Sequence, residues 1–319
     1  MNRHPLFRIV PDDTKIQFMR GRIMGLVVSA FLSAISVVLF FYPGLHLGID
    51  FSGGIVMEVR TPGLADFGKI RASLAEDKID VQGVQRFGDN NQVAIRLPTQ
   101  PTEAATQQTV TRVRAALEKA APGTRIMRTD AVGASVSAEL FHDGLMALGI
   151  SLLMILVYIW FRFEWQFAVG AVATLVLDVT KTIGFLAVTR LEFDLVMVAA
   201  ILTILGFSTN DKVVVYDRMR ENLRKYKTMP LRQLIDLSIN ETLNRTLGTS
   251  MTIFLASLPL ALFGGASIAH FAWMMLFGII VGTSSSIFIA APILLFLGEN
   301  RLRRDAGTPA KSADTLALP

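Results

Sequence analysis

The 319-residue chain contains no cysteine, and only 18% of its residues are charged. The lack of cysteine excludes disulfides, thiolate metal sites and cysteine nucleophiles. The low charge accompanies 52% hydrophobic residues and a mean hydropathy of +0.48, a more apolar composition than that of an ordinary globular domain. Most of the chain is therefore expected to lie in a membrane, and no metal site or cofactor is expected.

Six apolar runs approach or exceed the length of about 18 residues that a membrane-spanning helix needs. They cover roughly 22–42, 143–161, 165–189, 194–216, 246–265 and 269–297. The first run ends at Tyr42-Pro43-Gly44 without a small-residue cleavage site, which indicates an uncleaved anchor rather than a signal peptide. The sequence predicts a polytopic α-helical membrane protein with six spans.

The net charge of +5 comes from basic residues that lie beside the spans, where the positive-inside rule places them. They precede span one, connect spans four and five, and follow span six (Arg3, Arg8, Lys15, Arg20, Arg22; Arg218, Arg220, Arg224, Lys225, Lys227, Arg232; Arg301, Arg303, Arg304). This distribution predicts that both termini are cytoplasmic, with an N-terminal segment 1–21 and a polar, disordered tail 300–319. It does not indicate a nucleic-acid partner.

The long polar stretch 43–140 separates spans one and two on the side opposite the termini, and it is large enough to fold. Its pattern predicts the order βαββαβ of a ferredoxin-like domain. In the second helix, Thr102 with Ala105 does not make a full capping box, but Val110, Val113 and Leu117 recur at helical spacing. The expected strands and helices cover 54–60, 64–76, 81–87, 93–97, 102–120 and 124–129. The domain surface either contacts a substrate or partner or acts only as a spacer, and the sequence leaves both open.

Segment 217–245, between spans four and five, is amphipathic. Pro230 suits a first helical turn, and apolar residues recur after it (Leu231, Leu234, Ile235, Ile239). We expect a short helix that lies on the cytoplasmic membrane surface, next to membrane lipid. A helix that binds a partner is the alternative.

Two patterns of small residues have simple explanations. The glycines of segment 48–54 lack the following Lys-Ser or Lys-Thr of a phosphate loop, so a tight exit turn from span one is favoured. Asp50 either caps that turn or marks a contact between subunits. Span six carries small residues at four-residue spacing, which favours close packing inside the bundle over an oligomerisation face (Gly278, Gly282, Ser286, Ala290).

Four ionisable residues stand out inside the predicted spans, where each costs roughly 2.5–3.5 kcal/mol on insertion scales and therefore requires a partner or a role. Asp178 and Lys181 are three residues apart on span three and can pair. Asp211 and Lys212 are adjacent in span four, so they point about 100° apart on a helix. We expect Lys212 to extend to the cytoplasmic surface.

Asp211 is the most informative of these residues. It follows the loose polar run 206–210, which ends at Asn210, and it stands about 9 Å of helix rise from Asp217. Arg245 lies at the start of span five, at a similar depth. A carboxylate that faces a guanidinium is stabilised as an ion, and separation of the two favours proton uptake, so the pair could act as a proton switch.

The run from Leu205 to Asn222, LGFSTNDKVVVYDRMREN, resembles the fourth-span signature of the SecF family, the smaller subunits of bacterial SecD–SecF protein-export complexes. Three further segments strengthen the likeness: GIDFSGG at 48–54, VGASVSAEL at 132–140 and NRTLGTS at 244–250. Together with the predicted topology, the resemblance covers nearly the whole chain. Two departures are Lys212, where many relatives have a small hydroxyl residue, and Leu177, where many have histidine.

The resemblance implies a six-helix half of a transporter of the RND superfamily, with a periplasmic ferredoxin-like domain, in the bacterial inner membrane. It implies SecD as the other half, the SecYEG channel as a neighbour, and a translocating unfolded polypeptide as the substrate. The proton would be the coupling ion, with Asp211 as its carrier, Arg245 as the partner, and Asp178, Lys181, Asn210 and Lys212 as possible supporting residues. The chain would then be no enzyme but a proton-driven export component.

Two other functions are compatible with parts of the sequence. A small-molecule or lipid exporter of the same superfamily would usually carry both halves in one chain and larger insertions than this one. An intramembrane protease would use Asp178 and Asp211 as a paired acid and base. The Gly-x-Gly-Asp signature expected for such a protease is absent, because Thr209 and Asn210 precede Asp211.

Overall fold

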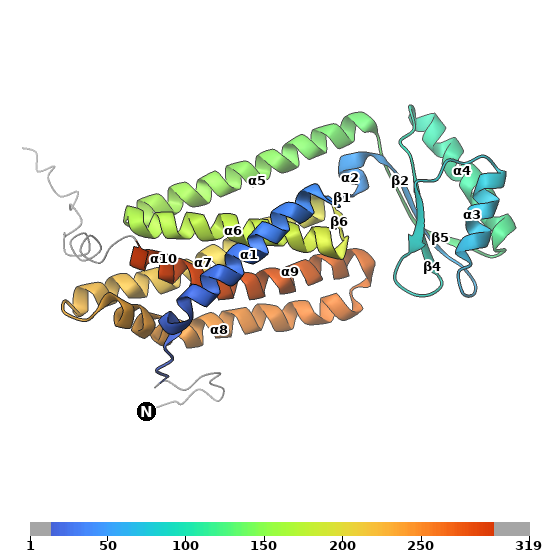
Figure 1. The fold of residues 1–319 in the computed structure, drawn as a ribbon. Helices are drawn as coiled ribbons and strands as arrows, with labels where there is room; N and C mark the ends of the chain where they lie inside the picture. Colours follow the sequence, from blue (N-terminus) through green and yellow to red (C-terminus); the bar gives the residue numbers. More distant parts are fainter. Residues whose placement is uncertain (1–13, 297–319) are drawn as a thin grey trace, which may run out of the picture.

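The computed structural model describes residues 14–296, which form a helical bundle and a separate α/β insertion (Figure 1). Six rods in this range are long and apolar enough to cross a membrane. They are α1 (Arg22–Phe41, preceded by the 3-10 turn η1, Phe18–Gly21), α5 (Ala134–Arg162), α6 (Trp165–Thr189), α7 (Leu195–Lys225), α8 (Leu231–Phe263), and a last rod of α9 (Gly265–Ser285), η2 (Ser286–Ala290) and α10 (Ala291–Phe296). The six predicted spans are confirmed. The predicted tail 300–319 and most of segment 1–21 lie outside the described residues.

The insertion domain, residues 54–132, joins the bundle between α1 and α5. It consists of β2 (Gly54–Arg60), α3 (Phe67–Glu76), β3 (Gly83–Arg86), β4 (Gln92–Leu97), α4 (Glu103–Ala120) and β5 (Arg125–Val132). The strands lie in the order β3-β4-β2-β5, and every neighbouring pair is antiparallel. This is the predicted ferredoxin-like arrangement. Helices α3 and α4 cover one face of the sheet (Figure 1).

Alternation of side chains builds the core of the insertion domain. Ile55, Met57 and Val59 of β2 are almost fully buried, and they join Ile70 of α3 and Leu117 of α4 in one apolar cluster. Side chains also cap both helices: the Asp66 carboxylate accepts from the backbone at the start of α3, and Thr102 Oγ1 accepts from the Ala105 amide at 3.2 Å.

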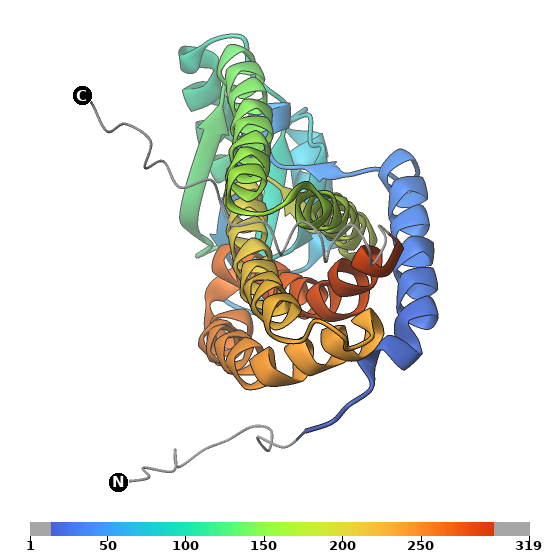
Figure 2. The ribbon, with the colours of Figure 1, turned by 90° about the vertical axis from the view of Figure 1, so that its left-hand side faces the viewer.

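Small residues let the membrane helices approach closely. A methyl group at Gly184 of α6 would lie 2.0 Å from Ser36 Oγ of α1, and one at Gly278 of α9 would lie 2.4 Å from Ile204 of α7. Gly282 similarly faces Ser208. The prediction that the small residues of span six serve packing inside the bundle is confirmed. Helix α1 lies at one side of the bundle, against α6 and the last rod (Figure 2).

The prediction of a short surface helix in segment 217–245 is wrong. Helix α7 continues to Lys225, and α8 begins at Leu231 and runs without a break to Phe263, with Pro230 as its N-cap. The apolar stripe, including Leu234 and Ile235, is buried in the main core of the bundle. The stretch is therefore the first part of a long helix whose apolar stripe packs into the bundle.

A short linking element joins the insertion domain to the bundle. Strand β1 (His46–Leu47) pairs in parallel with β6 (Glu192–Phe193), which connects α6 and α7, and the one-turn helix α2 (Ile49–Ser52) follows β1. The predicted exit turn at 48–54 therefore contains a turn of helix. Glycine is required at Gly54, because its φ is +118° and a methyl group would lie 2.6 Å from the Leu97 carbonyl.

Candidate functional site

Helices α6, α7 and the last rod place a polar cluster in the centre of the membrane bundle. Its centre is Asp178, and we call the set the Asp178 cluster. Its members are all buried and come from three rods (Asp178 and Lys181 on α6, Ser208 and Lys212 on α7, Ser285 on α9). Asp211 lies beside this cluster and is only 2% exposed.

The Asp178 carboxylate is held by four side chains. Its Oδ2 accepts hydrogen bonds from Lys212 Nζ at 3.0 Å, from Ser208 Oγ at 2.8 Å and from Ser285 Oγ at 2.7 Å. Its Oδ1 lies 3.7 Å from Lys181 Nζ, so the predicted pair with Lys181 is present. Two ammonium groups and two hydroxyls compensate the loss of hydration, which fixes Asp178 as an ion.

The prediction that Lys212 reaches the cytoplasmic surface is wrong. Its side chain is 1% exposed, and its Nζ contacts Asp178, Ser285 and the hydroxyl of Ser208, one helical turn earlier. A lysine extends toward the membrane surface when its ammonium has no partner at depth. Here Asp178 lies on the neighbouring helix at the same depth, so the ammonium stays in the bundle.

The predicted pair between Asp211 and Arg245 is not formed within the described chain. Asp211 faces the hydroxyls of Thr246 on α8 and Ser286 on the last rod, and its Oδ2 has no hydrogen-bond partner among residues 14–296. Arg245 is exposed on the outer side of α8. Adjacent residues on a helix point about 100° apart, so Thr246 faces Asp211 and Arg245 points out of the bundle.

The last rod changes its helical geometry at the site. It passes from α-helix to the π-helical turn η2 between Ser285 and Ser286. Ser285 contacts Asp178, and Ser286 lies beside Asp211. π-helical turns are rare and occur often at functional sites, where they redirect side chains. Through two successive residues, this turn therefore supplies one hydroxyl to each aspartate.

The two aspartates differ in what they can do chemically. Asp178 is bound by two lysines, whereas Asp211 has no ion pair among the described residues, although Lys212 is its neighbour along the chain. A carboxyl group without a fixed counter-ion can exchange a proton, and one locked between cations holds its charge. The protease alternative requires two aspartates that share one proton. This arrangement is not found, because the Asp178 carboxylate pairs with Lys212 instead.

A polar face of the bundle points outward near Asp211. Asn210 and Arg245 are exposed, and neither side chain has a hydrogen bond or an ion pair within residues 14–296. Exposed threonines continue this face on α7 and α8 (Thr203, Thr249, Thr252). We call these five residues the outward polar face. Arg245 and Asn210 lie in helices long and apolar enough to span a membrane, where a polar side chain without a partner is costly.

The hydroxyl groups around the two aspartates were missed from the sequence. Ser208, Thr246, Ser285 and Ser286 are common in spans and carry no signal one at a time. The four-residue spacing of Ser208 and Lys212 places them on one helix face, which could have indicated their contact. Within residues 14–296, no group of three His, Asp or Glu side chains could hold a metal ion.

Comparisons with known proteins point to one family. Residues 112–300 match the family described as protein export membrane protein SecD/SecF, C-terminal, and residues 38–61 match the SecD/SecF GG motif. The chain is 42% identical over 302 residues to the protein translocase subunit SecF of Rickettsia akari, covering 94% of this chain and 97% of that protein. It is 44% identical over 315 residues to the protein translocase subunit SecDF of Brucella abortus, covering 98% of this chain and 41% of the relative.

A solved structure shows the same arrangement. The crystal structure of SecDF from Thermus thermophilus, a translocon-associated membrane protein, superimposes with a TM-score of 0.81 at 29% sequence identity. The match covers 91% of this chain and 39% of the SecDF chain. This chain therefore spans well under half of the solved protein.

Proposed function

The chain belongs to the SecD/SecF family of protein-export membrane proteins, and from this we propose that it is the SecF half of a SecD–SecF pair. The pair would use the proton motive force to drive late steps of polypeptide translocation across the bacterial inner membrane. Asp211 would carry the proton. The single observation that supports this most directly is the buried carboxyl group of Asp211, which has no ion pair among residues 14–296.

The outward polar face supports SecD as the partner. An arginine exposed to lipid at this depth costs roughly 2.5–3.5 kcal/mol, and the exposed amide of Asn210 adds to that cost. A second helical half would remove the penalty by covering Arg245 and Asn210. The Brucella relative is named SecDF, and the match to this chain covers only 41% of it. The rest of that polypeptide is long enough to contain such a half.

Proton flow supplies enough energy for the proposed work. One proton that crosses a potential of 100 mV releases about 2.3 kcal/mol. This is enough to change the ratio of two conformations by about 50-fold, if the proton binds one of them selectively. Asp211 would bind the proton. Arg245, at the interface with SecD, would respond to the change in charge of Asp211. The fixed charges of the Asp178 cluster would keep α6 and α7 together.

We further propose that the insertion domain lies in the periplasm and that both termini are cytoplasmic. The basic residues of the α7–α8 connection and the ends of the chain would then lie inside, as the positive-inside rule favours. The translocating polypeptide would leave the SecYEG channel on the side of the insertion domain. Motion of that domain is the step that the proton would drive.

The test replaces Asp211 with asparagine and follows translocation in inverted membrane vesicles that contain SecD and SecYEG. The proton-dependent acceleration of a test secretory protein, measured by protease protection, should be lost in Asp211→Asn. It should persist in Asp143→Asn, whose carboxylate is 66% exposed on α5. Co-purification with SecD verifies that both variants assemble. Normal acceleration in an assembled Asp211→Asn protein would refute the proposed role.

A further inference from the structure

One ionic contact joins the sheet of the insertion domain to the membrane bundle. Arg96 lies on β4, on the sheet face that α3 and α4 leave open, and its guanidinium pairs with the carboxylate of Glu192 on β6. Arg96 Nη1 also donates to the Leu47 carbonyl of β1 at 3.0 Å. Gln85 of β3 donates to the same Glu192 carboxylate at 3.3 Å. Two strands of the domain therefore converge on one residue of the bundle.

Glu192 in turn lies three residues before Leu195, the first residue of α7. Strand β6 holds β1 in a parallel pair, and the Gly48 amide donates to the Phe193 carbonyl at 2.9 Å. Two carboxylates then cap α7: Asp50 accepts from the Leu195 amide at 3.1 Å, and Asp194 accepts from the Met197 amide at 2.8 Å. The start of α7 is thus tied to the segment that enters the domain.

Aromatic packing stiffens the same connection. The Phe51 ring of α2 lies 5.2 Å from the ring of Phe193 on β6 and 5.5 Å from the ring of Phe141 on α5. Its side chain is buried, and Gly144 of α5 lies against it. Helix α2 is therefore wedged between α5 and the α6–α7 connection. A displacement of α7 along its axis would move β6 and, through Arg96 and Glu192, the sheet.

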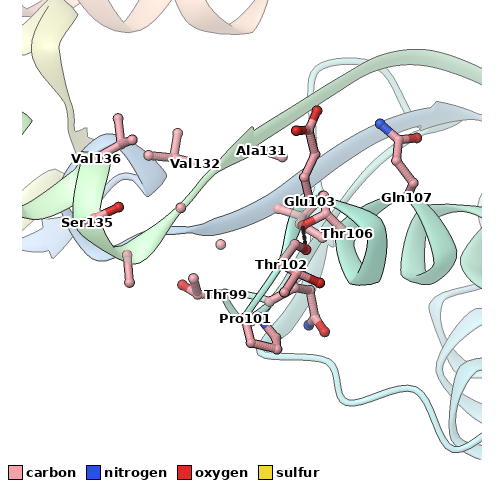
Figure 3. A pocket seen from close by; sticks show the side chains of 15 residues that line it. Thr99, Pro101, Thr102, Glu103, Thr106, Gln107, Ala131, Val132, Ser135 and Val136 are labelled. Atoms are coloured by element: carbon pink, nitrogen blue, oxygen red, sulfur yellow. Dashed lines mark hydrogen bonds between the residues drawn. The ribbon is translucent and has the colours of Figure 1, made fainter.

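Two open spaces border the insertion domain where it meets the bundle. A cleft of about 670 Å³ separates the open face of the sheet from the end of the bundle, and Glu58, Arg128 and Glu192 are among its lining residues. A second cavity of about 780 Å³ borders the connection from β5 to α5. Figure 3 shows this cavity, with Thr99 and Thr102 facing Val132 and Ser135 across it.

We propose that Arg96 and Glu192 form an ionic joint that transmits movement of α7 to the insertion domain. Asp211 lies sixteen residues beyond Leu195, about 24 Å along the same helix, so a shift of α7 at the proton site reaches the joint through one rigid rod. The consequence for export rests on the proposed function. The mechanical link itself does not, because it can be measured as a distance. Arg96 and Glu192 are positioning residues and touch no proton.

The test uses charge reversal and a swap. Two spin labels, at Gln108→Cys on α4 and at the exposed Val188→Cys on α6, report the distance between the domain and the bundle, and the chain has no cysteine to interfere. Arg96→Glu and Glu192→Arg should each broaden the distance distribution and reduce translocation to the level found without a proton gradient. The double variant Arg96→Glu/Glu192→Arg should restore both. The milder variant Glu192→Gln should broaden the distribution without reversing a charge.

Arg114→Glu is the matched control, since Arg114 is exposed on α4 and has no ion pair among residues 14–296. It should change neither measurement. Unchanged distances in Arg96→Glu and Glu192→Gln, or failure of the swap to restore both readouts, would overturn the joint. Loss of proton-driven export in Asp211→Asn, together with normal export in Arg96→Glu, would refute the joint and leave the proposed function intact. If translocation by the wild type did not depend on the proton gradient, the proposed function would be refuted. The joint would then be tested by the distances between the spin labels alone.

Discussion

Replacing Asp178 with asparagine is expected to destabilise the bundle more than removing either lysine that Asp178 binds. The substitution keeps the size of the side chain and removes the one negative charge between Lys181 and Lys212. These lysine side chains are 7% and 1% exposed, so neither ammonium can regain its hydration in place. Breaking a buried pair in this way costs about 3–5 kcal/mol, or roughly two to nearly four orders of magnitude in the folded-to-unfolded ratio.

Removing Lys212 should cost less, because Asp178 keeps other partners. In Lys212→Met the carboxylate still accepts from Ser208 and Ser285 and still lies near Lys181. The loss should be about 1.5–3 kcal/mol, the range for a hydrogen bond to a charged group. The double variant Asp178→Asn/Lys212→Met should cost less than the sum of the single changes by about 1–3 kcal/mol, since the second change removes a charge left alone by the first.

Unfolding by SDS in mixed micelles, followed by tryptophan fluorescence, measures these free energies. Asp143→Asn is the control, because its carboxylate is exposed on α5 and should change stability by no more than about 0.5 kcal/mol. The asymmetry between Asp178→Asn and Lys212→Met is the decisive result. If Asp178→Asn matched the exposed control, the cluster would not be a buried ion network, and the assignment of Asp178 as a fixed charge would be wrong.

Two further changes test packing and charge elsewhere in the chain. Gly184→Ala should destabilise the bundle by about 1–3 kcal/mol in the same SDS assay, because the new methyl group would overlap Ser36 of α1, whereas Gly149→Ala, which has open space, should be neutral or stabilising. Burial raises the pKa of Glu58 on the open face of the sheet, and the nearby carboxylates of Asp130 and Glu192 raise it further against the opposing effect of Arg128. A group whose pKa is raised in the native state contributes stability below the pKa of the unfolded state, and this stability is lost as pH rises through the native pKa. The melting temperature of Glu58→Gln should therefore depend less on pH above about 4.5 than that of the wild type. An unchanged pH dependence would contradict this.

The features that depend on composition along the chain could be predicted from the sequence. Each span is a run of apolar residues whose length the membrane sets, and β2 was predicted with its exact ends because its side chains alternate between two faces. The start of α8 could not be placed in this way. A polar stretch with a stripe such as Leu234 and Ile235 suits a surface helix equally well, and only contact with α7 decides between them.

In the site, the depth of a residue in the membrane could be predicted from the sequence, but the direction of its side chain could not. The sequence indicated that Asp211 and Arg245 lie at similar depth, but the rotation of α8 about its own axis depends on contacts with other helices. That rotation brings Thr246 rather than Arg245 to Asp211. The position of Lys212 depended on Asp178, which lies 34 residues earlier in the chain. Spacing along one helix specifies which residues share a face, and not what that face meets.

The exposed Arg245 also bears on how the amount of this chain would be matched to the amount of its partner. A chain that inserts without a partner would leave a guanidinium and the Asn210 amide exposed to acyl chains, where local thinning of the bilayer and entry of water are the available remedies. Such a defect distinguishes an orphan from an assembled subunit. Membrane proteases that act on poorly inserted helices would remove the orphan, so the amount of this chain would follow the supply of its partner without any dedicated regulator.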